Sequence, residues 1–122
     1  ILILGVGPIL KEALDAAEKL KEDNNIDVSV YSMGGIRPLD IDFLERIASH
    51  KYKAWLTLEE HGLSGGLGAT INNWSIINNK NIKIVNLTTP NNFIHNLGNQ
   101  SFVRESLHLN KNSIVKKIVE LC

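Results

Sequence analysis

The residues best suited to chemistry stand in the middle of the chain, where Glu59, Glu60 and His61 follow the apolar run 54–58. A run of this length and composition is typical of a buried parallel strand. Carboxylate and imidazole groups at a strand end can act as acid–base or hydrogen-bonding groups. The cluster is a poor metal site, because neighbouring strand residues point to opposite faces and no second histidine is close in sequence. A solvated strand end explains the cluster equally well.

A glycine-rich loop follows this cluster and leads into a helix expected over residues 66–78. Its glycines are Gly62, Gly65, Gly66 and Gly68. Free N–H groups at a helix N-terminus could hold a phosphate or another small anion. The loop lacks the Lys-Ser/Thr pair of a nucleotide P-loop, and glycines also let a helix pack closely on a sheet. We favour the packing interpretation.

A second glycine pair, Gly5 and Gly7, follows the first apolar run. In a dinucleotide-binding fingerprint a third glycine would stand at position 10, which is Leu10 here, and an acidic residue would end the second strand, where Ser32 and Met33 stand. The pair therefore predicts a tight strand-to-helix turn and no dinucleotide site.

Apolar strands alternate with helix-like segments along the whole chain. Strands are expected over residues 1–4, 28–31, 54–58 and 82–87. Helices are expected over residues 8–22, 40–48, 66–78, 101–107 and 112–121, with Asp40 as the N-cap of the second. This alternation predicts a single three-layer α/β/α domain over residues 1–122 with a mainly parallel sheet.

Composition narrows the class of protein. The 122 residues carry 13 basic and 13 acidic side chains, so no net charge favours nucleic acid or an anionic membrane. No apolar run reaches the length of a membrane span, no signal peptide is visible, and one cysteine, Cys122, fits a reducing compartment. We expect a cytoplasmic protein. Because the chain starts in a buried strand without Met, we also expect it to be a fragment of a longer chain.

Several segments together resemble the C-terminal domain of transketolase-like thiamine-diphosphate enzymes. This group includes split transketolase C-terminal subunits, 1-deoxy-xylulose-5-phosphate synthases and 2-oxoacid dehydrogenase β subunits. The matching segments are the strand-then-glycine opening 1–7, I-R-P-L-D at 36–40, T-L-E-E-H at 57–61, G-G-L-G at 65–68 and the last helix, 109–121. The resemblance implies a four-stranded sheet in the order 2-1-3-4.

Two features depart from the family pattern. The family's G-[IV]-P-D-x-F segment is T-T-P-N-N-F at residues 88–93 here, so only the proline and the aromatic residue remain. The family's antiparallel edge strand, which would precede Ile1, is missing. Its absence leaves the edge beside the second strand open.

The resemblance implies a role in which the domain does not itself catalyse the reaction. In the family, thiamine diphosphate and a divalent metal (Mg2+) lie between the two preceding domains, which bind its pyrimidine and diphosphate. We expect this domain to bind neither thiamine diphosphate nor Mg2+ and to have no catalytic residue. We expect it to support subunit contacts and the substrate entrance of the full enzyme. That enzyme would be a homodimer or heterotetramer that transfers two-carbon ketol units. The candidate interface or entrance residues are Arg37, Glu60, His61, Gly65, Gly66 and Gly68, with Trp74 and residues 64–67 as possible subunit contacts. The alternative is a stand-alone small-anion or phosphate-binding regulatory module that uses loop 62–68.

Overall fold

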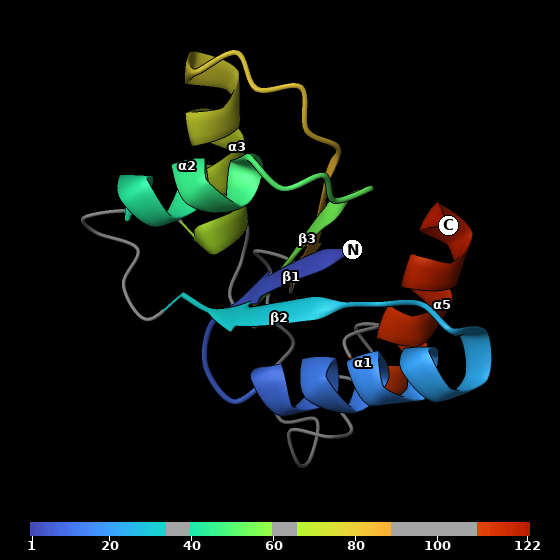
Figure 1. Cartoon of the computed structure of the whole chain (residues 1–122). Coiled ribbons are helices and arrows are strands. Elements are labelled where there is room, and N and C mark those ends of the chain that lie inside the picture. Colours follow the sequence, from blue (N-terminus) through green and yellow to red (C-terminus); the bar gives the residue numbers. More distant parts are fainter. Residues whose placement is uncertain (34–39, 60–65, 89–109) are drawn as a thin grey trace.

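The computed structural model describes residues 1–33, 40–59, 66–88 and 110–122, and this part of the chain forms a sheet covered by helices (Figure 1). The strands are β1 (Leu2–Gly5), β2 (Ser29–Ser32), β3 (Trp55–Glu59) and β4 (Ile84–Thr88). The helices are α1 (Leu10–Asn24), α2 (Ile41–Ala48), α3 (Leu67–Ile77) and α5 (Lys111–Leu121). The helix predicted over residues 101–107 lies outside the described residues.

The four strands form one parallel sheet in the order β2-β1-β3-β4, which confirms the predicted order. Each strand begins one or two residues later than its apolar run predicts and ends one residue later. Pairing continues through Gly5 opposite Ser32 and through Glu59 opposite Thr88, so small and polar residues extend the ladder. An apolar run therefore predicts the position of a strand more accurately than the residue at which the strand ends.

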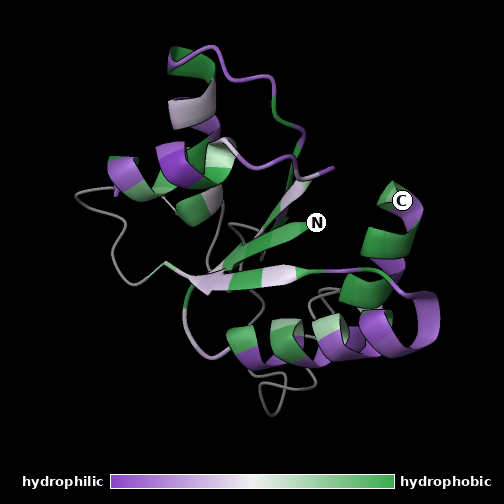
Figure 2. Ribbon diagram, in the orientation of Figure 1, coloured by the Kyte–Doolittle hydropathy of each residue, from purple (hydrophilic) through white to green (hydrophobic). Residues whose placement is uncertain are grey.

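Alternating side chains on the strands build two apolar cores, one on each face of the sheet. Ile3, Leu56 and Leu58 pack with the inward residues of α1 and α5. Leu2, Leu4, Trp55 and the inward residues of α2 and α3 pack on the opposite face. Figure 1 shows these two helix layers on either side of the strands, and Figure 2 shows α1 with its hydrophilic side turned outward. The predicted three-layer architecture is confirmed.

Polar residues fix the ends of several helices. The carboxylate of Asp40 accepts a hydrogen bond from Phe43 N at 3.0 Å, which confirms the predicted N-cap of α2. Asn25 ends α1 in the left-handed conformation, with φ of 53°. The Asn110 side chain caps α5 by accepting a hydrogen bond from Ser113 N at 2.9 Å. This cap was not predicted from the sequence.

The turn between β1 and α1 has the tight geometry that the glycine pair predicts. Gly7 has φ of +83°, a backbone conformation that favours glycine. Leu10 N donates to Gly7 O at 3.1 Å, and a Cβ added to Gly5 would lie 2.6 Å from Leu10 Cδ2. Leu10 therefore packs directly over the strand end.

The last helix is attached to the first by a carboxylate. Glu12 Oε2 in α1 accepts a hydrogen bond from Lys111 N at 2.9 Å, at the first residue of α5. An acidic side chain at a helix N-terminus compensates a free N–H group and interacts favourably with the helix dipole. This contact fixes where α5 begins against α1.

Candidate functional site at the carboxyl edge of the sheet

The carboxyl end of β3 carries the central residue of the site, Glu59. Its side chain is only 2% exposed. An unpaired carboxylate in such a place would be costly, so its partners decide what it can do. For Glu59 the interpretation as a solvated strand end is wrong, because the start of α3 covers it.

Both carboxylate oxygens of Glu59 are bound by the backbone of α3. Oε1 accepts a hydrogen bond from Leu67 N at 2.9 Å, and Oε2 accepts one from Gly68 N at 2.6 Å. Gly66, at the N-cap position, has extended backbone and no side chain that could cap the helix. Glu59 therefore acts as the N-cap of α3 from a different element, with its negative charge at the positive end of the helix dipole.

This capping bears on the anion-binding alternative. A phosphate held by the glycine loop would use the first N–H groups of α3. Two of those groups, from Leu67 and Gly68, already donate to a carboxylate of the same chain. An external anion there would have to displace a buried negative charge that has no other partner among the described residues.

A second polar pair lies two residues before Glu59 on the same face of the sheet. Thr57 is fully buried in β3, and its Oγ1 donates to Asn86 Oδ1 in β4 at 2.5 Å. The two residues are direct neighbours in the register of the strands. Thr57 and Asn86 were not predicted from the sequence as site residues, although each interrupts an otherwise apolar strand. Their pairing satisfies a polar group inside the core and fixes the β3–β4 register.

Stacked indole rings lie further along the same face. The rings of Trp55 and Trp74 lie 5.9 Å apart at an angle of 14°, and Trp74 is 4% exposed. This burial places both residues in the core and does not support Trp74 as a subunit contact. Its Nε1 has no hydrogen-bond partner within the described ranges.

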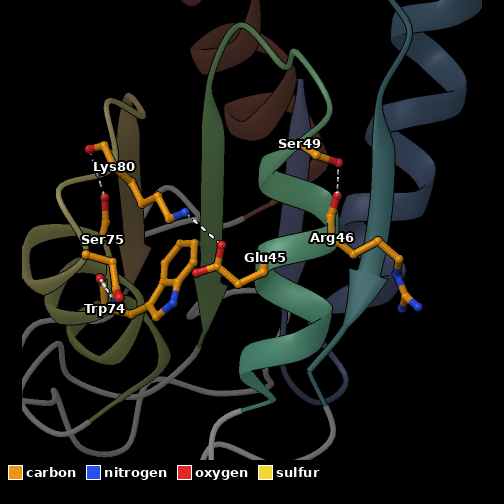
Figure 3. Close-up of polar contacts among 7 residues, drawn as sticks. Glu45, Arg46, Ser49, Trp74, Ser75 and Lys80 are labelled. Carbon is orange, nitrogen blue, oxygen red and sulfur yellow. Dashed lines mark hydrogen bonds and ion pairs between the residues drawn. The ribbon is translucent and has the colours of Figure 1, made fainter.

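The charged pair Lys80 and Glu45 lies beside the Trp74 ring. Lys80 Nζ lies 5.7 Å from the ring centre and 2.7 Å from Glu45 Oε2 of α2. Figure 3 shows the Lys80 side chain extending across the indole toward Glu45. The pair joins α2 to the segment that follows α3, so this layer of the fold is held by charge as well as by apolar contacts.

The predicted site residues divide into two groups. Gly66 and Gly68 lie at the start of α3, where Gly68 N binds Glu59. The other candidates, Arg37, Glu60, His61 and Gly65, lie outside the described residues. The structure therefore places Glu59 and the α3 start in one site, and the role of the remaining candidates stays a prediction.

Within residues 1–33, 40–59, 66–88 and 110–122, no three His, Cys, Asp or Glu side chains cluster where they could hold a metal ion. Glu59, the buried acidic residue of this part of the chain, already uses both oxygens. Its carboxylate is therefore not free to bind a cofactor. In the same ranges no helix combines the length and apolar character needed to cross a membrane.

Two curated proteins that are similar to this chain are both 1-deoxy-D-xylulose-5-phosphate synthases. The 1-deoxy-D-xylulose-5-phosphate synthase of Clostridium tetani is 31% identical over 121 residues, which cover 99% of this chain and 19% of that protein. The synthase of Dehalococcoides mccartyi is 36% identical over 126 residues, which cover 99% of this chain and 18% of that protein. The chain thus spans less than a fifth of the length of these relatives.

A solved structure and a family model agree with these relatives. The structure described as "Split gene transketolase, inactive beta4 tetramer" superposes with a TM-score of 0.82 at 24% identity, covering 98% of this chain and 38% of that one. This likeness supports the fold. The model of the transketolase C-terminal domain matches residues 1–114. The chain belongs to the transketolase C-terminal domain family.

Proposed function

We propose that this chain is the non-catalytic C-terminal domain of a thiamine-diphosphate enzyme that transfers two-carbon ketol units. In that enzyme it contributes to subunit assembly and to the substrate entrance. Thiamine diphosphate and Mg2+ are bound by the preceding pyrimidine- and diphosphate-binding domains, and the assembled enzyme is a cytoplasmic homodimer or heterotetramer. The identity of the relatives as synthases supports the reaction class.

One observation carries the non-catalytic part of the proposal, namely the double hydrogen bond from α3 to Glu59. Acid–base catalysis requires a group that can reach the reacting atoms and exchange a proton with them. Glu59 is 2% exposed and faces two backbone N–H groups. Its position supports a structural role at the carboxyl edge, the edge at which open α/β folds usually meet their ligands.

The proposed entrance or interface residues are Arg37, Glu60, His61 and the glycines Gly65, Gly66 and Gly68. Glu60 and His61 directly follow the fixed end of β3, and Gly66 and Gly68 lie at the fixed start of α3. The paired end of β3 and the capped start of α3 flank residues 60–65, which supports a role in which these side chains contact substrate or a neighbouring domain. They would act by contact and orientation, without a chemical step.

The test uses the full-length protein that contains this chain. In a ketol-transfer assay, His61→Ala should raise KM for the sugar-phosphate or oxoacid substrate, or weaken assembly. It should leave the Kd for thiamine diphosphate unchanged. His50→Ala is the matched control, because His50 is exposed and its Nδ1 contacts only Arg46 O among the described residues. A His61→Ala variant with unchanged kinetics and assembly would remove His61 from the proposal, and a weakened cofactor Kd would overturn the non-catalytic assignment.

A further inference from the structure

Helix α3 begins without a cap of its own. Gly66, at its N-cap position, has the extended backbone that capping residues ordinarily adopt, but it has no side chain that could accept a hydrogen bond. Helices α2 and α5 carry such a side chain at the same position, Asp40 and Asn110 respectively. The first N–H groups of α3 must therefore find their acceptor elsewhere.

The acceptor comes from the end of β3. The Glu59 carboxylate accepts hydrogen bonds from Leu67 N at 2.9 Å and from Gly68 N at 2.6 Å, and both contacts are buried. A local cap moves together with its helix, whereas a cap from another element also fixes where the helix begins in space. Glu59 therefore determines the position of the α3 start relative to the sheet.

The strand end itself is a fixed reference point. Glu59 is paired with Thr88 of β4 in the register of the sheet. Two residues earlier, the buried Thr57 side chain donates to Asn86, which holds β3 against β4. The backbone of Glu59 is therefore held by the sheet, and its side chain carries that position across to α3.

The first turn of α3 also has internal bonds that do not depend on Glu59. Gly66 O accepts hydrogen bonds from Thr70 N at 3.1 Å and from Thr70 Oγ1 at 2.8 Å. These bonds close the turn from within. Loss of the Glu59 contact can then release the α3 start from β3 while the helix persists, so the position of the helix and its existence can be tested separately.

The turn that Glu59 holds contains Gly66 and Gly68, two of the proposed entrance residues. We propose that Glu59 is a positioning residue for the substrate entrance. It contacts no substrate itself and acts through the α3 start, which it holds at a fixed distance from the carboxyl edge of β3. This proposal rests on the function proposed above and adds the residue that sets the geometry of the entrance.

The test measures KM and kcat of ketol transfer in the full-length protein, well below the unfolding temperature of every variant. Glu59→Gln places an amide NH2 group against one of the two backbone donors, so one bond to α3 is lost. KM for the substrate should rise by about 10-fold, while kcat and the Kd for thiamine diphosphate stay unchanged. Glu59→Asp keeps the charge but is shorter by one methylene group, about 1.5 Å, so it cannot reach both N–H groups and should raise KM as well.

Glu12→Gln is the matched control, because Glu12 also accepts a hydrogen bond from the first N–H group of a helix, that of Lys111 in α5. Helix α5 packs on the opposite face of the sheet from α3. The control substitution should lower stability and leave KM unchanged. Hydrogen exchange gives a readout that does not need activity. The first turn of α3 should exchange faster in both Glu59 variants and at the wild-type rate in Glu12→Gln.

Three results would overturn the proposal: Glu59 variants with wild-type exchange at the α3 start, a Glu59 variant with faster exchange and a wild-type KM, or a Glu12→Gln variant in which KM rises equally. Circular dichroism checks folding, and Glu59→Asp decides the outcome if Glu59→Gln does not fold. The failures of the two proposals can be told apart. A wild-type protein without thiamine-diphosphate-dependent ketol transfer overturns the proposed function and with it this role of Glu59, whereas an active wild type with unchanged KM in the variants overturns only the role of Glu59.

Discussion

Glu59 Oε2 accepts a hydrogen bond from the backbone N–H of Gly68 at 2.6 Å, so the end of β3 holds the first turn of α3 directly. The contact joins the end of β3 to the last glycine of the glycine-rich loop, which lies in the first turn of α3. It replaces the side-chain cap that Gly66 cannot provide. The sequence alone suggested an acid–base role for the Glu59 carboxylate, and the structure gives it a structural role instead.

Replacing Glu59 with Gln should destabilise the domain markedly. The amide NH2 group would face a backbone donor, so one buried N–H group of α3 would lose its acceptor, at a cost of about 2 kcal/mol. Urea-induced unfolding measures this change. Glu18→Gln, on the exposed side of α1, should change the unfolding free energy by less than about 0.5 kcal/mol. Equal effects of the two substitutions would contradict the capping role.

Gly7→Ala should lower the unfolding free energy by about 1 to 2 kcal/mol, because Gly7 has φ of +83° and alanine is strained there. A clash does not contribute, since a Cβ at this position meets nothing within 4 Å. Gly7→Asn should cost less, because asparagine tolerates left-handed backbone. Thermal unfolding of the three proteins gives the ranking, and an alanine variant as stable as the wild type would rule out the strain.

The Glu45–Lys80 pair should show a small coupling energy. Their side chains are 44% and 27% exposed, so solvent screens the 2.7 Å contact and a double-mutant cycle should give about 0.5 kcal/mol. Glu45→Gln and Lys80→Met are suitable substitutions, because Met retains apolar contact with the Trp74 ring. The coupling should shrink in 1 M salt, where the Debye length is about 3 Å. A coupling that salt does not change would show that the pair acts by packing alone.

Asp27 should titrate below its ordinary value. A hydrogen bond from Lys21 at 2.8 Å, and then the positive charge of Lys21, lower the pKa of Asp27 from 3.8. The folded-state pKa lies below the unfolded one, so the stabilisation is present above the unfolded pKa and is lost as the pH falls through the folded pKa. NMR titration should show the Asp27 pKa rising toward 3.8 in Lys21→Met. In Lys19→Met, an exposed lysine on the same helix, it should not move.

The sequence predicted the fold closely because periodicity reports burial directly. The alternating faces and the Asp40 cap are confirmed. The strand order, which the family resemblance implied and periodicity did not, is confirmed as well. Strand ends were less accurate, because Gly5 and Glu59 belong to the ladder without being apolar.

The site was harder to predict, because residue type alone does not give the surroundings of a side chain. Only the position of α3 over the end of β3 makes Glu59 a buried cap. Trp74 was predicted as a possible subunit contact, and its burial against Trp55 places it in the core. The Thr57–Asn86 pair depends on the register of β3 against β4, which local sequence does not encode.

The contact between Glu12 and Lys111 has a consequence for the order in which the chain can fold during synthesis. The core on the α1 face includes Ile114 and Ile118 from α5, beside residues near the start of the chain. While the ribosome is still making the middle of the protein, that face of the sheet lacks its second helix and leaves apolar surface open to water. Completion of this half of the core therefore waits for residues 110–122. Within this domain, α1 is synthesised before α5 and provides the surface on which α5 docks.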